Sequence, residues 1–198
     1  MANVVLVHTR ELDRRSLLIL DELVATATPA DLDLPTPCAG WTLADLLRHQ
    51  VGENNGFAIA VRHGSAPDWD GDLGDHAYRA YAASVDAYLA AFADDAVLDR
   101  TLTIGGLGDY PGHIAARMHL IDTVVHGWDL AKTLGRPYEP LPEAVRDALE
   151  FAERIPADPE VRRQRGTFAP VVELAGDVPE FDRLLGLLGR SPGWERPN

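Results

Sequence analysis

Hydrophobic residues recur at helical spacing in several separate stretches of the chain. Over residues 9–27, leucine and valine recur near helical spacing, with polar residues between them. This spacing predicts a helix with one apolar face. The same pattern returns over residues 42–62, 75–93 and 111–134. Four helices that each carry one apolar stripe are typical of a bundle, so the sequence predicts a mainly α fold.

Local signals mark the ends of two of these helices. Thr42 followed by Asp45 resembles a capping box, which predicts the start of the second helix. Gly64 follows the last apolar residue of that helix and favours its end. Pro111 suits the first turn of the fourth helix, and Gly135 favours its termination.

Shorter elements are expected between and after the long helices. Residues 98–112 contain a β-prone Leu-Thr-Ile run and several glycines, which favour an extended piece or a hairpin. The chain then offers a helix over 141–154, a β-prone stretch over 168–174 and a last helix over 180–188.

The length of 198 residues fits one domain, or one domain with a small appendage. No internal repeat or long linker divides the chain. We expect a helical bundle over residues 1–136 and a small α/β accessory segment over residues 137–198 that packs on it. The single cysteine, Cys38, excludes an internal disulfide and fits a reducing compartment.

Charge and hydropathy limit the classes of partner that the protein can bind. The formal net charge of −13 argues against nucleic acid, because phosphate binding needs a basic surface. No stretch approaches 18 apolar residues, and the N-terminal sequence lacks the pattern of a secretory signal. We therefore expect a cytoplasmic protein, a monomer or homodimer, whose partner is a small molecule and not a membrane.

A polar stripe runs along the fourth predicted helix. His119, Asp122, His126 and Asp129 follow one another at spacings of three, four and three residues, which places them on one helical face. Aliphatic residues border this stripe on both sides. The pattern favours a buried polar seam, which requires partners for its polar groups.

The second predicted helix carries a similar pair. His49 and Glu53 lie four residues apart among apolar positions, and Asn54 follows. Two helices that each bring an imidazole and a carboxylate inward can build a metal site in a bundle core. Such ligands suit Zn²⁺, Fe²⁺ or Ni²⁺ and leave coordination positions open. For either pair alone, a surface hydrogen bond or ion pair is the alternative.

These motifs also carry a family resemblance. The chain contains TPCAGWTLADLLRHQVGEN and HLIDTVVHGWDLAKTLG, and its tail contains FAPVVEL and DRLLGLLGRSPGW. In combination they resemble the mycothiol-dependent maleylpyruvate isomerase family and its uncharacterised metal-binding relatives, over nearly the whole chain. The resemblance implies a DinB-like four-helix bundle and a divalent metal held by His49, Asp122 and His126. The isomerase has glutamate where Asp122 stands, so this residue departs from the family pattern.

The resemblance implies mycothiol as a cosubstrate, and the two imidazoles and one carboxylate favour zinc as the metal, with nickel or iron as the other candidates. We expect an enzyme that isomerises a small electrophile or transfers the thiol to it. A metal-dependent hydrolase or lyase with water as the nucleophile is one alternative, and a non-catalytic metal-binding or small-molecule-binding protein is another. His119 and Glu53 are the catalytic candidates. His119 could instead be a buried structural histidine, and Glu53 could instead orient His49.

Three further features each have a structural interpretation, and for two of them a functional one stands beside it. Cys38 lies just before a predicted helix start, where a thiolate is stabilised, but its loop could equally serve as a docking element. Trp128 and Asp129 are expected to join the fourth helix to a neighbour. The arginine-rich residues 162–166 could contact a carboxylate-bearing substrate, although a solvated surface patch is the default interpretation.

Overall fold

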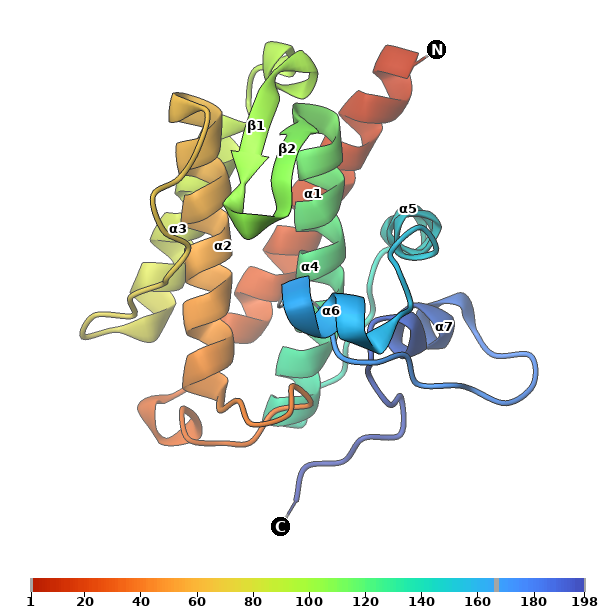
Figure 1. Cartoon of the computed structure of the whole chain (residues 1–198). Helices are drawn as coiled ribbons and strands as arrows, with labels where there is room; N and C mark the ends of the chain where they lie inside the picture. The colour runs from red at the N-terminus through yellow and green to blue at the C-terminus, as the bar shows by residue number, and fades with distance from the viewer. Residues whose placement is uncertain (1, 166–167, 198) are drawn as a thin grey trace.

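Four long helices form the body of the protein in the computed structural model, which describes residues 2–165 and 168–197. They are α1 (Ala2–Val24), α2 (Leu43–His63), α3 (Ala77–Ala91) and α4 (Gly112–Leu134). Figure 1 shows them side by side, with α2 packed against α3 and α1 packed against α4. The mainly α bundle predicted from the hydrophobic spacing is confirmed. None of the described helices is long and apolar enough to cross a membrane.

The start of α2 is set by the expected capping box. The backbone N–H of Thr42 donates to Asp45 Oδ2 at 3.0 Å, and the backbone N–H of Asp45 donates to Thr42 Oγ1 at 3.3 Å. These bonds satisfy two N–H groups that have no partner within the helix. At the other end, Gly64 adopts a φ of 91°, a left-handed conformation that glycine reaches without strain. The helix is therefore fixed at both ends.

The expected hairpin is also present. Strand β1 (Thr101–Ile104) pairs antiparallel with β2 (Gly108–Pro111), and the hairpin packs against α2 and α4. Three short 3₁₀ turns complete the connections: η1 (Pro29–Asp31), η2 (Asp95–Asp99) and η3 (Gly105–Leu107).

The C-terminal segment consists of helices α5 (Pro142–Ala152), α6 (Pro159–Arg165) and α7 (Glu180–Leu187). Helix α6 falls in the arginine-rich region and was not predicted. The β-prone stretch 168–174 was expected to be a strand, and this is wrong: no described residue after Pro111 belongs to a strand. Pro170 has no backbone N–H to donate, and Val172 N–H instead bonds to the carbonyl of Gly186 at 2.9 Å.

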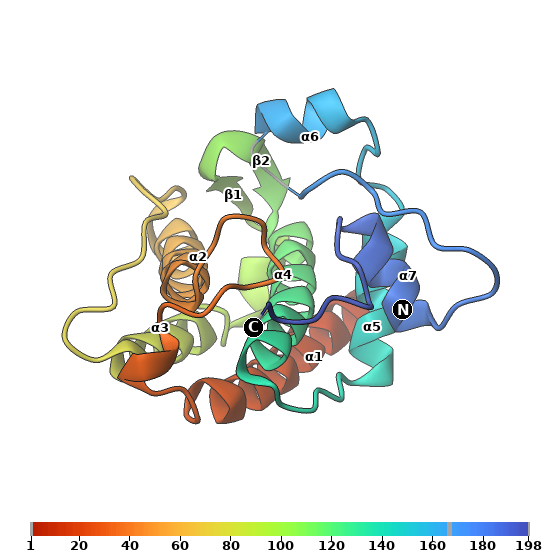
Figure 2. The ribbon, with the colours of Figure 1, turned by 90° about the horizontal axis from the view of Figure 1, so that it is seen from below.

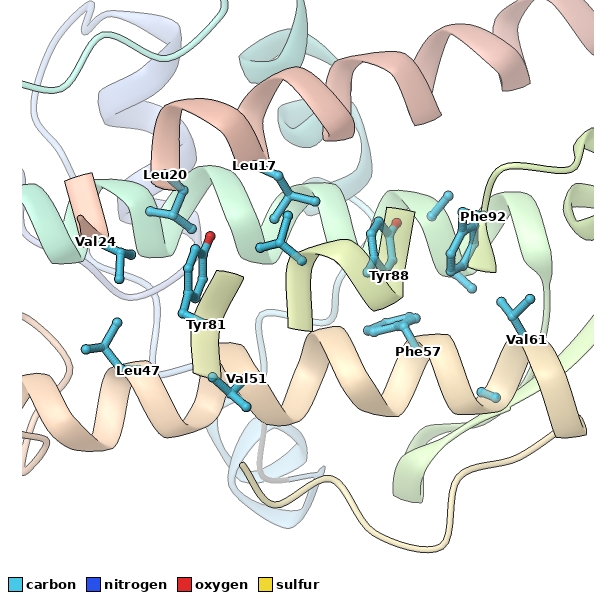
Figure 3. Close-up of a cluster of buried hydrophobic side chains, with 14 of the residues drawn as sticks. Leu17, Leu20, Val24, Leu47, Val51, Phe57, Val61, Tyr81, Tyr88 and Phe92 are labelled. Carbon is cyan, nitrogen blue, oxygen red and sulfur yellow. The ribbon is translucent and has the colours of Figure 1, made fainter. Parts of the chain in front are cut away.

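Two hydrophobic clusters hold these parts together. The first fills the bundle, where leucines of α1 meet Phe57 of α2 and Tyr81 and Tyr88 of α3 (Figure 3). The second lies between α1, α4, α5 and α7 and includes Val124 and Leu184. Each large apolar side chain buried in this way stabilises the fold by roughly 1.5–3 kcal/mol. The C-terminal segment thus shares a core with α4, the helix that carries the polar stripe.

Candidate metal centre

The centre lies where α2 and α4 face each other. His49 comes from the second turn of α2, and Asp122 and His126 lie one turn apart on α4. The Nε2 atom of His49 is 3.2 Å from Asp122 Oδ1, and the Nε2 atom of His126 is 3.3 Å from the same oxygen. We call these three residues the triad. The structure therefore brings the three expected ligands together.

The spacing of these atoms fits a divalent cation. One ligand atom from each residue lies within 4.8 Å of the others. Zinc binds nitrogen and carboxylate oxygen at about 2.0–2.2 Å, so two ligands in a tetrahedral arrangement are roughly 3.3–3.6 Å apart. The two contacts to Asp122 Oδ1 are close to this value. A set of two imidazoles and one carboxylate also leaves a coordination position for a further ligand.

Asp122 is held in place by a neighbour that the spacing argument missed. The side-chain amide of Gln50 donates to Asp122 Oδ2 at 2.6 Å, which leaves Oδ1 to face both histidines. Burial would raise the pKa of Asp122, but His126 and His49 outweigh it and hold the pKa well below its usual range. The carboxylate is therefore negative at neutral pH, as a metal ligand must be.

Each histidine of the triad has an outer carboxylate on its other ring nitrogen. Nδ1 of His126 lies 2.8 Å from Asp129 Oδ2, a hydrogen bond that sets Nε2 toward the centre. Nδ1 of His49 lies 4.0 Å from Glu53 Oε1, an ion-pair distance rather than a hydrogen bond. Burial would lower the pKa of His126, but the Asp122 carboxylate raises it well above the usual value.

Glu53 has an unusual carboxyl group. Burial and the charge of Asp122 raise its pKa to about 7, although the two triad histidines act in the opposite direction. Its side chain keeps 23% of its surface exposed, compared with 6% for His126. Glu53 thus lies on the side of the triad that solvent can reach.

Trp41 lies beside both histidine rings of the triad. Its indole is nearly parallel to the His126 ring, with centroids 6.2 Å apart, and lies 5.2 Å from the His49 ring. No spacing in the sequence marked this tryptophan as a neighbour of the triad, because it precedes the cap of α2.

Cys38 and a distant arginine complete the surroundings of His126. Cys38 Sγ lies 3.2 Å from Asp129 Oδ2 and 4.0 Å from His126 Nδ1. Arg190, after α7, donates from Nη2 to Asp129 Oδ2 at 2.9 Å and to Cys38 Sγ at 3.2 Å. Figure 2 shows how these distant residues come together, because the loop before α2 and the chain after α7 both run toward α4. Asp129 therefore joins α4 to the C-terminal segment, as expected, while also bonding to His126.

The described side chains of the arginine-rich stretch, those of residues 162–164, make their contacts away from the triad. Arg162 is buried and donates to the backbone carbonyls of Pro156, Ala169 and Leu187. Arg163 forms an exposed ion pair with Glu160. The side chain of residue 165 and the whole of residue 166 lie outside the described part of the chain. The described arginines here serve structure and the surface rather than a substrate site.

His119 lies in a separate buried network. Its Nδ1 is 2.9 Å from Asp13 Oδ2 and its Nε2 is 2.8 Å from Asn54 Oδ1. Tyr88 donates its hydroxyl to the same Asp13 carboxylate and stacks on the His119 ring with centroids 3.6 Å apart. Asn54 in turn donates to Ser84 Oγ at 2.9 Å.

This network ties α1, α2, α3 and α4 together at one level of the bundle. Both ring nitrogens of His119 are engaged by protein groups, and among the described residues no hydrogen bond or ion pair joins it to the triad. The contacts therefore match the structural alternative considered for His119, and they give its expected catalytic role no support.

Comparison with known proteins adds the family. The model of the mycothiol maleylpyruvate isomerase N-terminal domain matches residues 14–131, a stretch that contains the whole triad. Two uncharacterised proteins from two strains of Mycobacterium tuberculosis are each 29% identical over 169 residues, which cover 85% of this chain and 90% of theirs. No solved structure matches significantly. This chain, with its DinB-like helical bundle, belongs to the mycothiol maleylpyruvate isomerase N-terminal domain family.

Proposed function

We propose that this protein is a metal-dependent enzyme that uses a low-molecular-weight thiol to isomerise a small electrophile or to transfer sulfur to it. The observation that carries this proposal is the convergence of two imidazole nitrogens, from His49 and His126, on one oxygen of Asp122 within 3.3 Å. Membership of a family named for mycothiol supports the choice of the thiol.

In this proposal His49, Asp122 and His126 hold the ion, and zinc suits this set of ligands best, with nickel and iron as the other candidates. A divalent ion with an open position lowers the pKa of a thiol that binds it and so supplies a nucleophile near neutral pH. Aspartate in place of the family's glutamate is compatible with this role, because Gln50 fixes the shorter side chain with one oxygen toward both histidines.

Glu53 is the residue to which we assign proton transfer. Its carboxyl lies beside His49 on the exposed side of the triad, and its pKa of about 7 suits a group that accepts and returns a proton at neutral pH. A bound cation nearby would lower this pKa and favour the charged, proton-accepting form. The proton of the incoming thiol would pass to this carboxylate.

The two reactions begin with the same step. In isomerisation the thiol sulfur bonds to one carbon of a polarised double bond, the π electron pair moves onto the electron-withdrawing group that polarises it, and the remaining single bond rotates. The carbon–sulfur bond then breaks as the double bond forms again, and the thiol is released unchanged. In sulfur transfer the carbon–sulfur bond persists, and a leaving group departs from the electrophile with the displaced electron pair.

The test combines metal content with thiol consumption. Tag-free protein, stripped with a chelator and reloaded with Zn²⁺, should contain close to one ion per chain by elemental mass spectrometry. It should then consume mycothiol in the presence of chlorodinitrobenzene faster than the stripped protein does. His126→Ala should lose both properties, because it removes one of three ligands, whereas His63→Ala, at the exposed end of α2, should keep both.

Two results would change the proposal. A protein that binds Zn²⁺ through the triad but never consumes a thiol would favour the alternatives, namely water activation or simple binding. A protein that takes up no divalent ion after reloading would remove the basis of the proposal altogether.

A further inference from the structure

We propose that Asp129 and Arg190 are positioning residues of the metal centre, and that the C-terminal segment orients the ligand His126 through them. This inference rests on the metal site proposed above. It goes beyond the three ligands, because it assigns a role to a residue far outside the stretch 14–131 that the family model matches.

The contacts form a chain from the C-terminal segment to the ligand. Arg190 donates from Nη2 to Asp129 Oδ2 at 2.9 Å, and its Nε lies 3.3 Å from the same oxygen. That oxygen is in turn 2.8 Å from Nδ1 of His126. Arg190 Nη1 donates to the carbonyl of Leu188 at 2.8 Å, so the guanidinium is itself fixed at the end of α7.

Burial makes this arrangement costly to keep for stability alone. The Asp129 side chain is fully buried, and that of Arg190 exposes 8% of its surface. Two charges lose much of their hydration at such sites, and an apolar pair of similar volume often gives equal or greater stability. A role in orienting His126 explains the pair better, because Asp129 bonds to the His126 ring and Arg190 bonds to Asp129 and to the neighbouring Cys38.

The geometry has a direct chemical consequence for His126. A carboxylate that accepts the proton of Nδ1 fixes the tautomer in which Nε2 carries the lone pair, and Nε2 is the atom that faces Asp122. Arg190 holds Asp129 in the position needed for this bond. Without Arg190, the carboxylate would be a buried charge with fewer partners and would be free to turn away from the ring.

A second cation site is the rival interpretation of the same residues. Cys38, His126 and Asp129 do bring three ligand atoms within 4.8 Å of one another. However, the Nη2 atom of Arg190 bonds to both Cys38 Sγ and Asp129 Oδ2. A guanidinium that already occupies two of three ligands repels a further cation, so the contacts favour positioning over metal binding here.

The experiment measures Zn²⁺ affinity by competition with a chromogenic chelator at one fixed pH. Asp129→Asn and Arg190→Met should each weaken binding by roughly 10- to 100-fold, the usual effect of removing an outer partner of a ligand. Arg162→Met is the matched control. Arg162 is also a buried arginine of the C-terminal segment, but among the described residues it bonds only to backbone carbonyls. Its loss should lower the melting temperature and leave Zn²⁺ affinity unchanged.

Two further variants separate positioning from general damage. Arg190→Lys keeps a cation near Asp129 but cannot make all the bonds of the guanidinium, so it should restore part of the affinity. The double variant Asp129→Asn/Arg190→Met should bind Zn²⁺ about as weakly as Asp129→Asn alone, because Arg190 acts through Asp129. Affinity in Arg190→Met equal to that of the parent, or a loss equal to that of Arg162→Met, would overturn the inference.

Nitrogen NMR of His126 in the metal-free protein keeps this inference distinguishable from the proposed function. With both ring nitrogens protonated, the parent and Arg162→Met should show an Nδ1 proton held in its hydrogen bond to Asp129, and the signal of this proton should change in Asp129→Asn and Arg190→Met. If the parent binds no Zn²⁺, the proposed function fails while the ring orientation is still measured. An Nδ1 signal unchanged in Arg190→Met would overturn the positioning role.

Discussion

His49 and Asp122 are separated by 73 positions in the sequence, yet Nε2 of the first lies 3.2 Å from Oδ1 of the second. The contact joins α2 to α4 and involves the atoms that would bind a metal. In the metal-free protein these atoms satisfy one another with a proton between them. Protons and a divalent cation therefore compete for the same place.

Metal affinity is consequently expected to depend on pH. The Asp122 carboxylate holds the pKa of His126 well above its usual value, so a proton must leave this ring when a metal binds. Lowering the pH from 8 to 5.5 should weaken Zn²⁺ binding by about tenfold per pH unit for each proton displaced. Chelator competition at several pH values measures this, and an affinity that stays constant between roughly pH 5 and 8 would exclude the triad as the site.

Glu53 should give the metal-free protein a second pH dependence, in its stability. A carboxyl whose pKa is raised from 4.5 to about 7 on folding binds its proton more tightly in the folded than in the unfolded state. Its contribution is therefore favourable below the unfolded value and is lost as the pH rises through 7. The loss amounts to at most about 3 kcal/mol, and less where solvent screens the group.

The variant Glu53→Gln carries no charge at this position, so it should be more stable than the parent at pH 8 and close to it at pH 5. Urea unfolding in the presence of a chelator measures the difference. Glu143→Gln, on the exposed start of α5, is the control and should follow the parent at both pH values. A Glu53→Gln variant that loses stability at pH 8 would contradict the assignment of a raised pKa.

A substitution of His119 should lower the stability of the fold and leave Zn²⁺ affinity nearly unchanged. In His119→Leu the buried side chains Asp13 and Asn54 each lose a partner. Leaving a buried polar group without its hydrogen-bond partner typically costs about 1–3 kcal/mol, and two groups are affected here, so a large drop in melting temperature is expected. Zn²⁺ affinity, measured well below that temperature, should stay within about twofold of the parent, since His119 bonds to none of the triad residues.

His113→Leu serves as the control on the same helix. Within the described part of the chain His113 bonds only to the carbonyl of Leu98, and it is partly exposed, so its loss should cost much less stability. A His119→Leu variant that folds normally but fails to bind Zn²⁺ would instead show that His119 takes part in the metal site.

Helical spacing was sufficient to predict the bundle and to place a polar stripe on each of two helices, whereas the family resemblance singled out His49, Asp122 and His126 as the ligands. It works here because Asp122 and His126 lie four residues apart on one helix, and a short capping box fixes where α2 starts. Spacing along one helix says nothing, however, about contacts between segments distant in sequence. Arg190 lies 61 residues from Asp129, and Cys38 lies 88 residues from His126.

The same limit applies to one prediction that the contacts leave without support and to one that is wrong. His119 shares the helical stripe of the triad, so spacing alone could not show that its ring turns toward Asp13 on α1. The β-prone residues 168–174 have the composition of a strand, but a strand forms only where another strand pairs with it. Here the backbone N–H of Val172 instead donates to the carbonyl of Gly186, at the end of helix α7.

Trp41 provides a direct optical test of where the metal binds. Its indole lies 5.2 Å from the His49 ring and 6.2 Å from the His126 ring, centroid to centroid. An open-shell ion such as Co²⁺ accepts excitation from a nearby indole, whereas closed-shell Zn²⁺ does not. Adding Co²⁺ should therefore quench part of the tryptophan emission, and excess Zn²⁺ should restore it by displacing Co²⁺.

The chain contains four tryptophans, so the quenched part must be assigned by substitution. Trp41→Phe should remove most of the quenching while still binding Co²⁺ in a chelator competition, because Trp41 offers no ligand atom. Trp194→Phe, in the C-terminal segment that packs against α4, should retain it. Quenching that persists in Trp41→Phe and disappears in another variant would place the ion near a different tryptophan, and the triad would then no longer be its site.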